Sequence, residues 1–244
     1  MYNLLWSILV GAVVTVLIRT FGFSVWAGLI PGLLAFIGAY FVLARRTATK
    51  VQAIVGEAQK ELSIQPSNAK EQKLRIDKAI RILESALVYD KQQFMIGPEI
   101  HAQIGMIRYM VKDLDGALVH FAKANSRNWL PKALEGALWF QRKDPAKMEA
   151  AFESAVKVGK KEGLAWASYA WCLQSNKQSD KALKVMARAV EANPTDEKLK
   201  NGLTALQNDK KLKMKAFEPM WWQFGLEQPP MAMSGGRRVQ FDRR

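Results

Sequence analysis

The sequence has very few of the side chains on which most catalytic and metal sites depend. Its 244 residues include one cysteine, Cys172, and two histidines, His101 and His120. A single cysteine excludes an intrachain disulfide, and two histidines leave a zinc site short of its usual ligands. The glycine-rich phosphate-binding motifs, HExxH and CxxC are all absent from the sequence. We therefore expect no catalytic residue, no cofactor and no metal site, and a protein that is not an enzyme.

The first 44 residues lack acidic side chains altogether, and Arg19 is their only charged residue. All 22 Asp and Glu residues, and all but one of the 36 Lys and Arg residues, lie beyond residue 44. The formal net charge of the chain is +14. A basic excess of this size favours contact with anionic lipid, nucleic acid or an acidic partner.

Two long apolar runs occupy this charge-poor region, at residues 4–18 and 21–44. As a helix the second run is about 36 Å long, which exceeds the ~30 Å hydrocarbon core of a bilayer. The first run reaches only about 27 Å even when counted from Met1, which is marginal. We predict a transmembrane helical hairpin at 1–46, with helices at about 3–19 and 22–44.

Two other interpretations of the apolar region are a cleaved signal peptide and a single signal anchor. A signal peptide needs a basic segment before its apolar run and a small-residue cleavage site, and neither precedes Arg19. Basic residues also indicate the orientation of the hairpin, since Arg45, Arg46 and Lys50 follow the second run. The positive-inside rule then predicts an inner (cytoplasmic) membrane protein with both ends, and the domain that follows, in the cytoplasm.

Beyond the apolar region, small and large apolar residues recur at positions 8, 20, 24 and 27 of a unit of about 34 residues. Small residues at such positions allow two antiparallel helices to cross closely. The three clearest sets are Gly105, Ala117, Phe121 and Ala124; Gly136, Met148, Phe152 and Ala155; and Ala170, Ala182, Met186 and Ala189, the last followed by Pro194. The pattern resembles the tetratricopeptide repeat (TPR), which implies an all-α solenoid of helix-turn-helix repeats that binds other proteins.

The resemblance divides residues 47–194 into four TPR-like repeats, the first of them stretched by an insertion. A capping helix is predicted at 195–216, and a Trp-rich, basic, irregular tail at 217–244. The four repeats are expected at about 49–91, 98–126, 129–160 and 163–194.

In proteins with this repeat, ligands usually lie in the concave face formed by the first helix of each unit. The residues that the resemblance places there are mostly apolar and include methionine, which suits an aromatic or aliphatic peptide. Packing between neighbouring repeats is the alternative role for the same side chains. The predicted partner-binding groove comprises Met106, Tyr109, Met110, Leu130, Phe140, Leu164 and Trp171.

The tail is too apolar for a solvated linker because Met220, Trp221, Trp222 and Phe224 lie close together in it. Three roles are open from the sequence. The segment folds back into the groove as an internal ligand or lid, dips into the bilayer interface beside basic residues, or docks a partner.

Together these patterns predict a bacterial-type, membrane-tethered scaffold or adaptor that holds a protein or peptide partner at the cytoplasmic face of the membrane. The alternative is a peripheral module that binds anionic lipid or nucleic acid through the basic C-terminal region. Nucleic acid is the weaker partner, because basic and acidic residues are interspersed and no platform of aromatic and basic residues is evident.

Overall fold

The computed structural model describes residues 1–124 and 127–228, and within those ranges it is all-helical, without strands. The chain forms two compact units, Met1–Asn125 and Ser126–Arg244. Unit 1 contains α1 (Tyr2–Thr20), α2 (Val25–Ser63), α3 (Ala69–Ser85), the 3-10 helix η1 (Ala86–Tyr89), α4 (Ile96–Met110) and α5 (Leu114–Phe121). Unit 2 contains α6 (Trp129–Gln141), α7 (Pro145–Val158), α8 (Gly163–Ser175), α9 (Ser179–Ala192), α10 (Glu197–Gln207), and the 3-10 helices η2 (Met214–Phe217) and η3 (Met220–Phe224).

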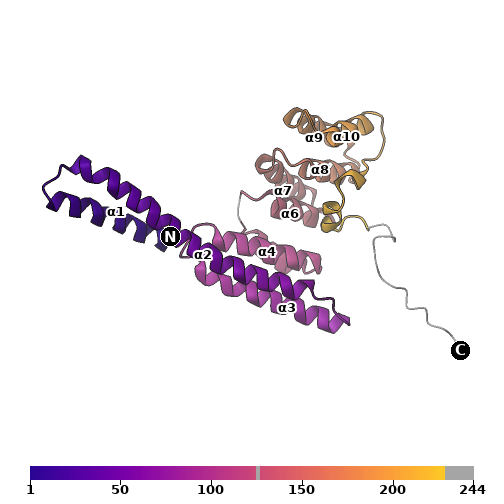
Figure 1. Ribbon diagram of the computed structural model, residues 1–244. Helices are drawn as coiled ribbons and strands as arrows, with labels where there is room; N and C mark the ends of the chain where they lie inside the picture. The colour runs from indigo at the N-terminus through magenta and orange to yellow at the C-terminus, as the bar shows by residue number, and fades with distance from the viewer. Residues whose placement is uncertain (125–126, 229–244) are drawn as a thin grey trace. The chain divides into compact units, whose positions relative to one another are not determined.

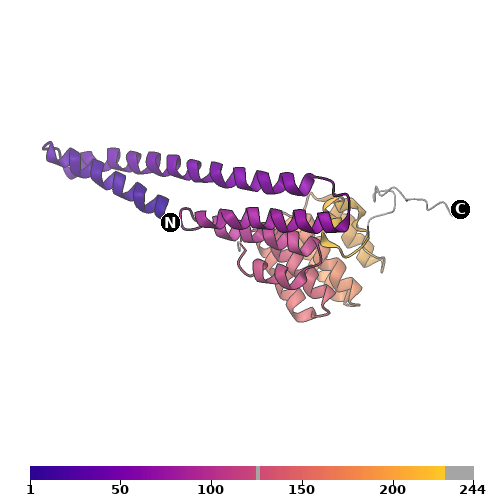
Figure 2. The same cartoon turned by 90° about the horizontal axis from the view of Figure 1, so that it is seen from below.

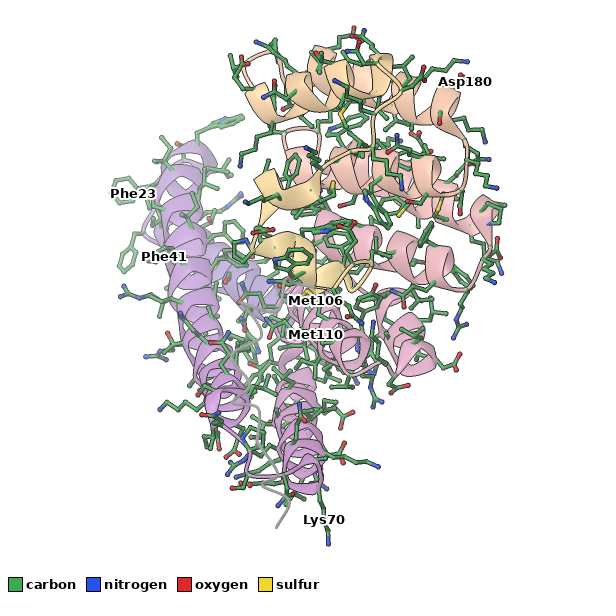
Figure 3. The ribbon with its side chains drawn as sticks, turned by 90° about the vertical axis from the view of Figure 1, so that its right-hand side faces the viewer. Phe23, Phe41, Lys70, Met106, Met110 and Asp180 are labelled. Atoms are coloured by element: carbon green, nitrogen blue, oxygen red, sulfur yellow. The ribbon has the colours of Figure 1, made fainter. Side chains whose placement is uncertain are left out.

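Helices α1 and α2 form an antiparallel hairpin at one end of unit 1 (Figure 1). Small residues allow the close approach: an ideal Cβ on Gly11 would lie 2.8 Å from the Gly32 carbonyl oxygen, and one on Gly32 would collide with Thr15 Oγ1. Most large side chains of the hairpin face outward, and Phe23 and Phe41 project away from it in Figure 3. By length and composition, both helices contain a segment able to cross a membrane.

Helix α2 continues far beyond the predicted end of the hairpin at residue 46. The sequence predicts separate helices for 22–44 and for the start of the first repeat, whereas the structure has one 39-residue helix (Figure 2). The reason is local, because residues 45–50 contain no glycine or proline to end the helix. The second half of α2 packs on α3 and α4 around a buried cluster of Ala58, Ala79, Ile80, Leu83, Ala86, Ile100 and Ile104.

The paired helices of both units cross at small residues. An ideal Cβ on Gly105 of α4 would lie 2.7 Å from the Phe121 ring of α5, so only glycine fits there. Gly136 of α6 is in the same relation to Phe152 of α7, at 2.6 Å. In unit 2 the Phe152 ring also stacks on Tyr169 of α8, with ring centroids 5.3 Å apart.

The same turn ends helices α4, α6, α8 and α10. Two residues past each helix, the backbone is left-handed, with φ of 65°, 59°, 60° and 54° at Lys112, Lys143, Lys177 and Asp209. The next residue then donates a backbone hydrogen bond back across the turn, as in a Schellman motif. The four bonds run from Asp113 to Arg108 (2.9 Å), Asp144 to Trp139 (3.0 Å), Gln178 to Leu173 (2.9 Å) and Lys210 to Ala205 (2.9 Å).

Helix α10 is shorter than the capping helix predicted at 195–216. It begins after Asp196, whose carboxylate accepts a hydrogen bond from the Lys198 amide at 2.9 Å. It ends at Gln207, because the left-handed Asp209 turns the chain out of the helical path. The following residues, up to η2, run without regular secondary structure.

Candidate peptide-binding site

Unit 2 brings together four of the predicted groove residues on two neighbouring helices. Leu130 and Phe140 belong to α6, and Leu164 and Trp171 belong to α8, which contacts α6. The Phe140 and Trp171 rings meet edge to face, with centroids 5.7 Å apart. Leu164 is buried, whereas the other three side chains are half-buried.

The C-terminal segment packs on the Trp171 ring of this pair. Trp221 of η3 is completely buried, and its ring lies 5.2 Å from that of Trp171 in an edge-to-face contact. Phe224 is also completely buried and stacks on Trp221 at 5.8 Å. We call Phe140, Trp171, Trp221 and Phe224 the aromatic row. Figure 1 shows the yellow C-terminal segment beside α6 and α8, the helices that carry Phe140 and Trp171.

Polar contacts hold the segment on both sides of the aromatic row. The indole N–H of Trp221 donates a hydrogen bond to Glu227 Oε2 at 2.8 Å, which satisfies the one polar atom of the buried ring. Earlier in the chain, the amide of Gln174 on α8 donates to the Lys210 carbonyl at 3.0 Å and accepts from the Leu212 amide at 2.9 Å. The Gln174 side chain therefore bonds to the backbone of residues 210 and 212 through both its donor and its acceptor, as the backbone of a neighbouring β-strand does.

The other two predicted tail residues are less enclosed. Met220 is 40% exposed, and Trp222 is half-buried. Within the segment, the completely buried Trp221 and Phe224 are therefore the anchors, and Met220 and Trp222 flank them. The segment beyond residue 228, including the basic end of the tail, lies outside the described residues.

The three predicted groove residues of unit 1 lie on α4 in different environments. Tyr109 is buried and packs on Phe121 of α5, with ring centroids 6.4 Å apart, so it belongs to the core of the unit. Met110 is 66% exposed, and Met106 is half-buried one turn earlier on the same helix (Figure 3).

Unit 2 has a second surface feature, a lysine-rich groove of about 550 Å³ beside α10. Lysines surround an apolar floor, and none of the described residues that line the groove is acidic. The amino group of Lys198 lies over the Phe217 ring at 5.6 Å. Lining residues include Lys198, Lys210, Lys211, Lys213, Lys215, Met186, Leu212, Met214 and Phe217. The alternation of lysine with leucine and methionine at 210–215 is its only sequence signal; the contributions of Met186 and Lys198 were missed.

The two histidines meet in unit 1. Their Nδ1 atoms lie 3.1 Å apart, so one ring must donate the hydrogen bond and the other must accept it. Burial, together with the neighbouring His101 ring, lowers the pKa of His120 from 6.5 to about 4. Desolvation also lowers the pKa of His101. Within the described ranges, no group of three or more metal-ligating side chains accompanies the pair.

The single cysteine is enclosed in α8. Cys172 is completely buried, and desolvation raises the pKa of its thiol well above the usual value. A thiol in this environment is a poor nucleophile. It acts here as a small apolar side chain next to Trp171.

No protein-family model and no curated protein matches the chain. Over the described residues the chain is all-helical and has two apolar N-terminal helices. Phe140 of α6 and Trp171 of α8 form the surface on which Trp221 packs, and we call this surface the aromatic seat.

Proposed function

We propose that this protein is a membrane-tethered adaptor that binds an aromatic peptide segment of a partner on α6 and α8. The observation that carries the proposal is the complete burial of Trp221 against Trp171. A surface that encloses an indole from a short 3-10 helical segment has the shape and chemistry needed to bind a similar segment from another protein. The proposed role is binding, without catalysis.

The repeated turns support a TPR-like solenoid as the binding scaffold. Helices α4, α6, α8 and α10 end in the same left-handed turn, and glycine occupies the helix crossing in two successive pairs. Such repetition is typical of helical repeat proteins, whose stacked units present an extended binding face. In this interpretation α10 is the first helix of a further unit, and the segment from 210 to 228 replaces its second helix.

The apolar hairpin supports a membrane tether. Its outward-facing side chains would be unusual in water, because an apolar patch of this extent is rarely left exposed on a soluble protein. Arg45, Arg46 and Lys50 follow the second apolar run and favour a cytoplasmic location for the part of the chain beyond it, at a bacterial inner membrane. Anchoring would confine the adaptor to the membrane surface and raise its effective concentration for partners there.

The seat is filled by the chain itself, so a partner must compete with residues 220–228. An intramolecular ligand has a high effective concentration, and a weak partner therefore cannot displace it. Only a partner that binds the seat tightly enough to displace the internal segment would be captured, which selects partners with a stronger aromatic motif.

A photoreactive residue at position 140 tests the proposal in cells. In the otherwise native chain we expect crosslinks within the chain, to residues 220–224. In the Trp221→Ala background, internal crosslinks should decline and crosslinks to one defined protein should appear at the membrane. The same residue at position 74, on the exposed surface of α3, is the control. Equal capture from both positions, or no capture from 140 in either background, would contradict the proposal.

The lysine-rich groove supports a second candidate function, the binding of an anionic ligand by the C-terminal region. Its five lysines and apolar floor suit an acidic amphipathic molecule, such as an anionic lipid. Lys198→Glu would then weaken binding to phosphatidylglycerol vesicles. Lys184→Glu, on an exposed lysine of α9 outside the groove, is the matched control. Unchanged binding by the Lys198 variant would remove this candidate.

A further inference from the structure

The loop between η1 and α4 lies at the base of the hairpin. The Tyr2 amide donates a hydrogen bond to the Lys91 carbonyl at 3.0 Å, and the Asn3 amide donates to the Gln92 carbonyl at 3.1 Å. These contacts satisfy amide groups at the start of α1 that have no partner within the helix. Figure 2 shows the loop beside the N-terminus of α1.

Contacts with α2 place the same loop close to the end of the apolar run. The Asn3 side chain donates to Thr47 Oγ1 at 2.9 Å, and Thr47 Oγ1 lies 3.5 Å from Gln92 Oε1. Thr47 is three residues beyond Ala44, which is about 4.5 Å along the helix axis. The headgroup layer on each side of a bilayer is roughly 5–7 Å thick. If residues 25–44 cross the hydrocarbon core, the loop lies at the depth of the headgroups.

The side chains around the loop suit that environment. Phe94 is 68% exposed, although contact between an apolar aromatic ring and water is energetically unfavourable. Lys91, Arg45, Arg46 and Lys50 are also exposed at the base of the hairpin, and Asp90 is the one acidic residue between 86 and 96. The Asp90 carboxylate is engaged by the Gly97 amide at 3.1 Å. The net charge of these residues is therefore positive, and the exposed Phe94 lies on the same loop as Lys91.

We propose that the loop Lys91–Phe94 is a second membrane contact, which binds the surface of an anionic bilayer. The Phe94 ring enters the boundary between headgroups and hydrocarbon, while Lys91 and the two arginines bind lipid phosphate. This inference rests on the proposed membrane tether. It adds a second attachment of unit 1 to the bilayer surface, at the base of the hairpin.

Depth-dependent fluorescence quenching on the full-length chain tests the contact. Phe94→Cys is labelled with an environment-sensitive thiol dye and reconstituted in phosphatidylcholine vesicles, with or without phosphatidylglycerol, that contain a nitroxide-bearing lipid. Cys172 is completely buried, and the native chain treated with the dye gives the background. Phe41→Cys, in the hairpin, reports hydrocarbon. Leu74→Cys is the solvent control. Its neighbour Arg75 pairs with Glu61 at 3.6 Å, and Glu61 lies roughly 21 Å beyond Thr47 along α2. Position 74 is therefore far from the bilayer.

We expect the label at 94 to be quenched severalfold more strongly than the label at 74, and more strongly with phosphatidylglycerol present. Lys91→Glu in the Phe94→Cys chain should reduce the effect of phosphatidylglycerol. Quenching at 94 no greater than at 74, with strong quenching at 41, would overturn the loop contact and leave the tether intact. Quenching at 94 that does not depend on phosphatidylglycerol would overturn the preference for anionic lipid. Absence of quenching at 41 would instead refute the tether itself.

Discussion

Replacement of Trp221 by alanine should release the C-terminal segment from unit 2. The indole is completely buried between Trp171 and Phe224. A buried aromatic side chain removes about 150–250 Å² from water, which is worth roughly 4–6 kcal/mol. Ordering a short segment costs about 1–2 kcal/mol per residue in backbone entropy, so the net free energy of docking is only a small part of the gross gain. Loss of the largest anchor exceeds that net gain, and the segment should detach.

The expected signature is local, because the helices of unit 2 keep their own core. Trp221→Ala should lower the free energy of unfolding by no more than the docking free energy, about 1–3 kcal/mol, although a core Trp→Ala change typically costs about 3–5 kcal/mol. Hydrogen exchange should accelerate at residues 214–228 and stay unchanged in α7 and α9. Met220→Ala, at a 40% exposed position, is the matched control and should leave exchange at 214–228 near the native rate. Native-like protection of 214–228 in Trp221→Ala would refute the reasoning.

Three further changes test the packing and the electrostatics. Gly136→Ala should lower the stability of unit 2 by about 1–3 kcal/mol in urea unfolding, because its Cβ would lie 2.6 Å from Phe152. Lys177→Gly should raise stability by about 0.5–1 kcal/mol, because glycine adopts its left-handed φ of 60° without a steric penalty. The low pKa of His120, about 4 in the folded chain, means that unit 1 loses stability as the pH falls from about 6.5 to about 4. The urea midpoint of unit 1 should fall over that range, and less so in His120→Gln.

Each of these changes has a control in the chain. Gly56→Ala faces open space and should not destabilise unit 1. Lys157 lies in the last turn of α7. Lys157→Gly should therefore destabilise unit 2, whereas Lys177→Gly should stabilise it. A flat profile of stability between pH 6.5 and 4 in the native chain would contradict the account of the paired histidines. Equal effects of Gly136→Ala and Gly56→Ala would contradict the glycine crossing.

Helix content was predictable from sequence, and so was much of the helix pairing. The spacing from Gly105 to Phe121 and from Gly136 to Phe152 matches contacts that the structure contains. The continuity of α2 was missed because the change from apolar to amphipathic sequence suggested a boundary, whereas a helix ends only where a residue stops it. At residues 45–50 the composition changes, but the sequence contains no residue that ends the helix.

The aromatic seat was only partly predictable. The sequence pattern indicates Phe140, Trp171 and Trp221, but it leaves three locations for the tail open. In the structure Trp221 packs on Trp171, and the Gln174 amide pairs with the backbone at Lys210 and Leu212. A single glutamine in a helix gives no sign of such a contact in the sequence. Tyr109, predicted as a groove residue, lies in the core, where it packs on Phe121 of α5.

The most direct test of the central claim is whether the seat on α6 and α8 binds a peptide supplied from outside the chain. A labelled peptide of residues 217–228 is titrated into the full-length native chain and into the Trp221→Ala chain, with fluorescence anisotropy as the readout. We predict saturable binding to the Trp221→Ala chain, little binding to the native chain, and none by a peptide that itself carries Trp221→Ala. Equal binding to both chains, or no binding to the Trp221→Ala chain, would contradict a peptide-binding seat that the chain's own tail occupies.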